Sequence, residues 1–165
     1  MGTLTPLYST PRHVAQLFNR AMALDENEKT AGLARELYRE VVRIAPDHWE
    51  AHNNLGVLAY RAKDPGAALD HWRDALDIEP LSAATLNNVG SMFYDERKYE
   101  LAVVYLEDSI RINPEQKEAR QNLALALERV GQRAAARRQW RSFLRRFPWG
   151  DDAEFARERL QKLAG

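Results

Sequence analysis

Residues 53–80 read NNLGVLAYRAKDPGAALDHWRDALDIEP, and residues 87–114 read NNVGSMFYDERKYELAVVYLEDSIRINP. The two segments lie 34 positions apart and share the same order of small, bulky and turn-forming residues. The same step separates four prolines and four alanines along the chain, at Pro46, Pro80, Pro114 and Pro148 and at Ala34, Ala68, Ala102 and Ala136. A period of 34 residues predicts an array of helical pairs, because such units bury their apolar faces by stacking on their neighbours.

The spacing within one unit indicates two helices with a turn between them. Residues Lys63–Gly66 read KDPG, which is typical of a turn. Apolar residues then recur three and four positions apart, as on one face of an α-helix, at Ala68, Leu69, Trp72, Ala75 and Leu76. An all-α fold follows, with two helices in each repeat.

Small and bulky residues alternate between columns of the repeat. One column holds Met22, Gly56, Gly90 and Ala124, and another holds Tyr38, Trp72, Leu106 and Trp140. Two antiparallel helices approach closely where a small residue on one faces a bulky side chain on the other. We therefore expect these two columns to face each other, with the tryptophans in the core.

The prolines give the boundaries of the units. Four repeats, 15–48, 49–82, 83–116 and 117–150, occupy residues 11–150, and residues 151–165 form an amphipathic helix that caps the array. Helix starts are predicted at Thr10–Pro11 and, from their N-cap residues, at Asp47, Asn113 and Asp151. Residues 1–10 are expected to be a mobile leader.

These columns, with Asn54-Leu55-Gly56 and Asn88-Val89-Gly90, resemble the tetratricopeptide repeat (TPR) family over residues 15–150. The resemblance implies a right-handed superhelical solenoid of four helix pairs plus the C-terminal capping helix, with the first helix of each pair lining a concave groove. The first unit departs from the family pattern. It has Met22 in place of the usual glycine, and residues 25–29 supply no glycine at its turn.

The resemblance also implies a peptide-binding groove. Amide side chains can pair with the backbone of an extended peptide, and tyrosines bury large areas while keeping a hydroxyl for bonding. The predicted groove residues are Asn53, Asn54, Val57, Tyr60, Asn87, Asn88, Ser91, Tyr94, Gln121, Asn122 and Leu125. Structural alternatives stay open, because the second Asn of each pair could bond to the neighbouring helix and the tyrosines could pack at the groove floor.

Some relatives clamp the C-terminal carboxylate of chaperone tails with lysine and arginine in this groove. The corresponding positions of the first repeats hold Asn19 with Ala23, or Asn53 with Val57. A later repeat holds Glu118 with Asn122. The clamp is missing, which argues against a co-chaperone of that kind.

Charge does not follow the repeat, although the net charge is zero. The units 49–82 and 83–116 each hold three basic and six acidic residues, whereas 117–150 holds nine basic and two acidic residues. A basic patch with four-residue spacing is predicted on the last unit, from Arg133, Arg137, Arg138, Arg141, Arg145 and Arg146. Three interpretations stay open: a solvated face partly neutralised by Glu154 and Glu158, a site for an acidic protein, or a nucleic-acid site.

Several classes of function are excluded or disfavoured. The absence of cysteine rules out disulfides and thiolate zinc sites, and no phosphate loop or nucleophile motif is present. His48 and His52 have a ligand-like spacing but no third ligand nearby in sequence, so surface histidines and no metal are expected. The sequence predicts no enzyme, no cofactor and no membrane insertion, and a cytoplasmic location.

A protein-interaction module is the leading hypothesis. It would bind an extended peptide or a helix of a partner protein in the groove and act as an adaptor or assembly scaffold. A second hypothesis is a homo-oligomer in which the basic last repeat of one copy docks on the acidic middle repeats of another. A third is a regulatory accessory to a transcription or secretion machine. Nucleic acid is disfavoured as a partner, because the chain has no recognition element of its own.

Overall fold

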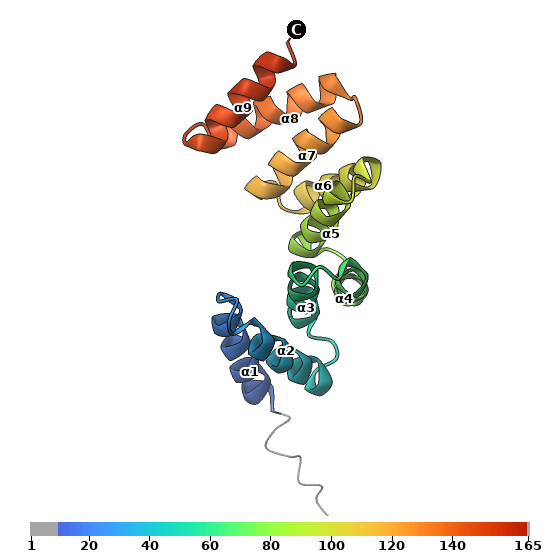
Figure 1. Cartoon of the computed structure of the whole chain (residues 1–165), viewed down its shortest axis with the longest axis vertical. Helices are drawn as coiled ribbons and strands as arrows, with labels where there is room; N and C mark the ends of the chain where they lie inside the picture. Colours follow the sequence, from blue (N-terminus) through green and yellow to red (C-terminus); the bar gives the residue numbers. More distant parts are fainter. Residues whose placement is uncertain (1–9, 165) are drawn as a thin grey trace, which may run out of the picture. The chain divides into compact units, whose positions relative to one another are not determined.

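The computed structural model describes residues 10–164, which form nine α-helices and no β-strand (Figure 1). The predicted leader lies outside the described residues except for Thr10. The helices are α1 (Pro11–Asp25), α2 (Ala31–Ile44), α3 (Trp49–Arg61), α4 (Pro65–Ile78), α5 (Ala83–Asp95), α6 (Tyr99–Ile112), α7 (Lys117–Arg129), α8 (Arg133–Arg146) and α9 (Asp151–Lys162). This is the all-α helical repeat that the 34-residue period predicts.

The chain divides into two compact units, one up to Pro80 and one from Leu81. In the first unit, α1 packs against α2 and α3 packs against α4. In the second unit, α5 pairs with α6 and α7 with α8, and α9 packs on α8. Each unit therefore has a core made by its own helix pairs.

Glycines mark the close approach of paired helices, as the columns predict. A Cβ atom added to Gly56 would lie 2.4 Å from Nε1 of Trp72, and one added to Gly90 would lie 2.7 Å from Cγ of Leu106. Trp72 and Leu106 are buried. In these two pairs the bulky side chain fills the space that the glycine leaves free.

The first pair departs from this pattern, as the sequence indicates. Met22 stands where the later repeats have glycine or alanine, and 48% of its surface is exposed. Its neighbour Ala21 is fully buried in the core beside Tyr38. The bulky column is thus kept in the first pair, whereas the small column moves by one position.

The turns inside the pairs differ in the same way. Lys63, Arg97 and Gly131, 34 residues apart, adopt the left-handed region with φ of 64°, 62° and 79°. The first turn is held by side chains instead. Asn27 accepts a hydrogen bond from the backbone N–H of Lys29 (2.9 Å), and the Thr30 hydroxyl donates to the carbonyl of Leu24 (2.6 Å).

Four helix starts test the predicted caps. Thr10 caps α1 as expected, accepting a hydrogen bond from the backbone of His13 (3.2 Å). The other three predictions are wrong by one to three residues, because the N-caps are His48, Gln116 and Gly150. The side chain of Asn113 bonds to the backbone of Glu115 in the preceding turn, so it is already used there.

Candidate peptide-binding residues

The paired asparagines of the first unit lie on α3, where they form a short relay of hydrogen bonds. The Asn53 amide donates to Oδ1 of Asn54 (3.1 Å), and the Asn54 amide donates to the hydroxyl of Tyr38 on α2 (3.0 Å). Asn53 is only 9% exposed, and its backbone carbonyl accepts from the Trp72 indole (3.1 Å). Asn54 is half-buried, so Asn54 rather than Asn53 faces solvent in this pair.

Tyr38 anchors this relay from the core. Its surface is fully buried, and burial raises the pKa of its hydroxyl to about 12, an effect that the hydrogen bond from Asn54 partly opposes. The phenol therefore stays neutral and keeps Asn54 in one orientation. This is the bond to a neighbouring helix that the sequence left as the structural alternative for the second asparagine.

An open hollow of about 360 Å³ adjoins this relay in the first unit. Arg61 crosses from α3 and pairs with Asp25 at the end of α1, with Nη1 2.7 Å from Oδ1. Apolar, amide and charged groups thus meet in one place. The residues that line the hollow are Met22, Asp25, Glu26, Tyr38, Asn54 and Arg61.

Sequence reasoning singled out Asn54 from this set but not the others. The departure of the first unit from the repeat, at Met22 and in the turn that begins at Asp25, was the available signal.

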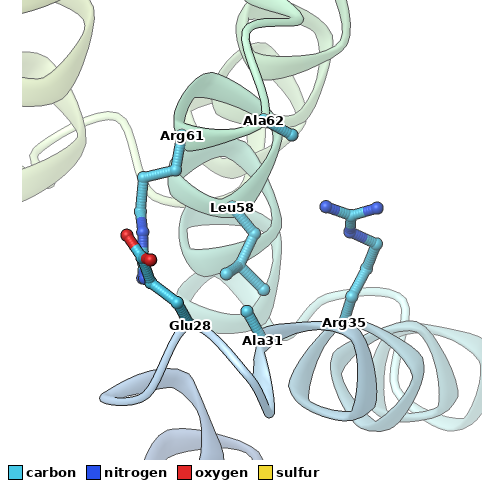
Figure 2. Close-up of a pocket in the computed structure, with 6 residues that line it drawn as sticks. All are labelled: Glu28, Ala31, Arg35, Leu58, Arg61 and Ala62. Atoms are coloured by element: carbon cyan, nitrogen blue, oxygen red, sulfur yellow. The ribbon is translucent and has the colours of Figure 1, made fainter.

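A smaller hollow of about 180 Å³ is lined by Glu28, Ala31, Arg35, Leu58, Arg61 and Ala62. Figure 2 shows Leu58 on α3 between the side chains of Arg35 and Arg61. Arg61 therefore lines both hollows.

The remaining predicted residues of α3 are half-buried. The ring of Tyr60 lies 5.9 Å from that of Trp72, centroid to centroid, and Val57 lies one turn before it on the helix. The Tyr60 contact agrees with the packing role that the sequence left open for the tyrosines. Part of the Val57 side chain and part of the Tyr60 side chain stay exposed to solvent.

In the second unit, α5 and α7 are joined by a polar contact between two predicted groove residues. The Asn122 amide on α7 donates to the Ser91 hydroxyl on α5 at 2.9 Å, and both residues are half-buried. Tyr94, one turn after Ser91, packs edge-on against Tyr99 at 5.4 Å between centroids. The other predicted residues here, also half-buried, are Asn87, Asn88, Gln121 and Leu125.

Glu128 of α7 has a structural role that the sequence did not reveal. Its carboxylate accepts from the Trp140 indole (2.7 Å) and forms an ion pair with Arg159 of α9. The glutamate side chain is only 8% exposed. Glu128 is therefore used inside the second unit.

The predicted basic patch lies on α8, and most of it is exposed. Arg146 pairs with Glu115 (3.0 Å), and Arg133 donates to the carbonyl of Leu163 (3.5 Å). Glu154 and Glu158, which one of the open interpretations has partly neutralising this face, form no ion pair within residues 10–164. Arg137 is half-buried, whereas Arg138, Arg141 and Arg145 are exposed and form no ion pair with another described residue.

Among the helices of residues 10–164, none is both long enough and apolar enough to cross a membrane.

Comparison with known proteins identifies the repeat. Two family models, each described as tetratricopeptide repeat, match residues 18–83 and 82–113. No curated protein sequence matches the chain significantly. Neither family match is to a catalytic family.

Solved structures share the fold at low sequence identity. The pilF protein of Pseudomonas aeruginosa has a TM-score of 0.79 and 22% identity. The superposed region covers 91% of this chain and 67% of pilF. MamA of Desulfovibrio magneticus RS-1 has a TM-score of 0.74 and 17% identity, and the match covers 92% of this chain and 93% of MamA. YrrB, described as a TPR protein with an unusual peptide-binding site, has a TM-score of 0.72 and 18% identity, with coverage of 89% and 80%. The repeat period, the packed glycines and both family matches agree: the chain belongs to the tetratricopeptide repeat family.

Proposed function

We propose that the chain is a protein-interaction module that binds an extended peptide or a helix of a partner protein. The family match supports protein–protein interaction, and the peptide-binding site named for YrrB supports a peptide as the ligand. As an adaptor or assembly scaffold, the chain would hold this segment against the first helices of its pairs.

The observation that carries the proposal is the hollow in the first unit. Met22 gives it an exposed thioether, a flexible apolar contact that adapts to different partners. Asn54 is held by Tyr38 at 3.0 Å and still has one amide hydrogen for a peptide carbonyl. A fixed polar group beside an adaptable apolar surface suits the backbone and one side chain of a bound peptide.

In the second unit, the pair of Ser91 and Asn122 is proposed to act in the same way. Their mutual hydrogen bond orients the amide, and each group keeps unused bonding capacity. Tyr94 lies one turn further along α5 and would supply an apolar anchor. Specificity would then come from the residues that differ between units, such as Met22.

Site-specific photo-crosslinking tests this assignment. A photoreactive phenylalanine analogue is placed at Met22, and in a matched control at Leu33 of α2, which is another exposed apolar residue at 61% exposure. After irradiation in lysate of the source cell, we expect a discrete partner adduct from position 22 and none from position 33. The substitution Asn54→Ala should weaken the adduct at position 22, whereas Gln161→Ala, exposed on α9, should not.

Two results would overturn the proposal. One is an adduct at position 33 with none at position 22, which would place the partner on the second helix. The other is an adduct at position 22 that Asn54→Ala leaves unchanged, since the amide would then not hold the peptide.

Self-association is a second candidate function, favoured by the charges of the described helices. Arg138, Arg141 and Arg145 of α8 are exposed and form no ion pair with residues 10–164, while Glu100 and Glu107 of α6 are exposed acidic residues. Opposite patches of this kind bring two copies together and are screened by salt.

Sedimentation velocity tests this candidate. A self-associating chain should form oligomers at low salt that dissociate at high salt, and Arg138→Glu with Arg141→Glu should abolish them. A monomer at all salt concentrations contradicts self-association and leaves the peptide-binding proposal untouched.

A further inference from the structure

Two histidines and an aspartate from neighbouring helices of the first unit meet in space. His52 lies on α3, and His71 and Asp74 lie one turn apart on α4. One ligand atom from each residue lies within 4.8 Å of the other two. The sequence considered His52 only with His48, which instead caps α3 and contacts Glu50 (3.2 Å).

A backbone carbonyl fixes the orientation of His52. Its Nε2 lies 3.0 Å from the carbonyl oxygen of Pro46, which can only accept a hydrogen bond. Nε2 therefore carries the hydrogen, and the neutral ring directs the lone pair of Nδ1 to its other side. Histidines that bind metals show this arrangement, in which the second nitrogen donates to a carbonyl or carboxylate.

The carboxylate of Asp74 lies close to this nitrogen. Nδ1 of His52 lies 3.5 Å from Oδ2 of Asp74. Two ligands of a tetrahedral zinc ion, each at about 2.0–2.1 Å, are separated by about 3.4 Å. The distance between these two atoms thus fits two ligands of a shared cation.

One nitrogen of each histidine, Nδ1, lacks a hydrogen-bond partner. Nδ1 of His52 and Nδ1 of His71 are both buried without a hydrogen bond. Buried polar atoms are normally satisfied, and unsatisfied ones in a cluster point to an ion or a proton that links them. Here the groups that converge are two imidazoles and a carboxylate, which all act as acceptors when deprotonated.

The surroundings suit a cation that enters from solvent. A hollow of about 330 Å³ is lined in part by His52, Asp74 and Asp77, and Asp74 is 56% exposed. The nearby cation Arg39 pairs with Glu36 at 2.7 Å, which reduces its repulsion of an incoming ion. The hollow also leaves room for water as a fourth ligand.

We propose that His52, His71 and Asp74 bind a divalent transition-metal ion, with Zn²⁺ as the preferred species. Imidazole ligands favour Zn²⁺, Ni²⁺ and Cu²⁺, whereas Mg²⁺ and Ca²⁺ require mainly oxygen ligands. The site joins α3 to α4 and leaves one coordination position for water or for a side chain of a bound partner.

Calorimetry with Zn²⁺ tests the site on the full chain after treatment with EDTA. We expect one Zn²⁺ per chain and no comparable binding of Mg²⁺. Loss of an outer-shell partner lowers metal affinity about 10–100-fold, so His52→Ala and His71→Gln should each lower it by at least about tenfold. Glu107→Gln, an exposed acidic residue on α6 of the second unit, is the control and should leave the affinity unchanged.

A spectroscopic readout separates the site from loss of folding. Co²⁺ added to the wild-type chain should give the visible absorption of a tetrahedral complex, which Zn²⁺ should displace, and circular dichroism should show each variant folded. The proposal is overturned if the wild-type chain gives neither heat with Zn²⁺ nor this spectrum, in which case a proton shared by His52 and Asp74 explains the cluster. It is also overturned if a folded His52→Ala, His71→Gln double variant binds Zn²⁺ as tightly as wild type.

Discussion

Gly56 illustrates how one residue in the repeat is determined by its neighbour. Trp72 occupies the space beside it, so that Gly56→Ala would place a Cβ atom 2.4 Å from the indole nitrogen. This nitrogen also donates to the Asn53 carbonyl, which restricts its movement. We expect Gly56→Ala to lower the free energy of unfolding by about 1–3 kcal/mol, as overpacked cores do.

Gly32 on α2 supplies the matched control for urea denaturation. No atom lies within 4 Å of a Cβ added there, and the residue is exposed. Gly32→Ala should therefore stabilise the chain by about 0.5–1 kcal/mol through helix propensity alone. If both substitutions change stability in the same direction, the contact with Trp72 does not determine the glycine.

Tyr38 predicts a pH dependence at the alkaline end. Its pKa is about 12 in the folded chain, against 10.0 when exposed, so its contribution is fully present below pH 10 and is lost as pH rises toward 12. A shift of this size corresponds to roughly 3 kcal/mol of unfolding free energy. Urea denaturation should show a larger loss of unfolding free energy above pH 10 for wild type than for Tyr38→Phe. An equal loss in the two chains would contradict the burial of this hydroxyl.

At the scale of elements, α9 is held to the rest of the second unit by an ion pair. Arg159 pairs with Glu128, whose side chain is 8% exposed, and Phe155 packs against Trp140 at 5.8 Å between centroids. Removing one partner of a buried ion pair leaves the other charge unpaired, which costs about 3 kcal/mol or more. We therefore expect Arg159→Met to destabilise the second unit by about this amount in urea denaturation.

The exposed arginines of α8 provide the comparison. Arg138→Met removes a charge of the same type that has no ion pair within residues 10–164 and should change stability by less than about 0.5 kcal/mol. Similar effects from both substitutions would mean that net charge, rather than the pair with Glu128, determines the loss.

The sequence predicted those elements that repeat. The period of 34 placed Gly56 against Trp72 and Gly90 against Leu106, because close helix packing needs the same sizes in each unit. Helix starts were missed by one to three residues at Asp47, Asn113 and Asp151, since several polar residues near a helix end compete to cap it.

The site residues were harder to predict because they depend on contacts between helices. Asn53 and Asn54 are adjacent in sequence and equal in chemistry, yet the bond to Tyr38 leaves Asn54 at the hollow while Asn53 is buried. His52 and His71 are 19 positions apart on paired helices, so a search for short ligand spacing could not bring them together. Only the packing of α3 against α4 brings the two histidines together.

At the scale of the whole molecule, the two compact units predict that a destabilising substitution in one unit loosens mainly that unit. Each unit has its own buried cluster, around Tyr38 in the first and around Trp140 in the second. In repeat proteins, stability is approximately a sum of local terms. Gly56→Ala should therefore accelerate amide hydrogen exchange in α1–α4 more than in α5–α8, as measured by mass spectrometry, and uniform acceleration over both ranges would show a single cooperative unit.

Each unit also contains a buried tryptophan, Trp72 at 1% and Trp140 at 0% exposure. Their indoles are shielded and hydrogen-bonded in different ways, to a backbone carbonyl and to a carboxylate. Trp149, by contrast, is 83% exposed. Once Trp49 and Trp149 are replaced by phenylalanine, each half of the chain carries a single tryptophan, whose emission reports the opening of that half without an external label.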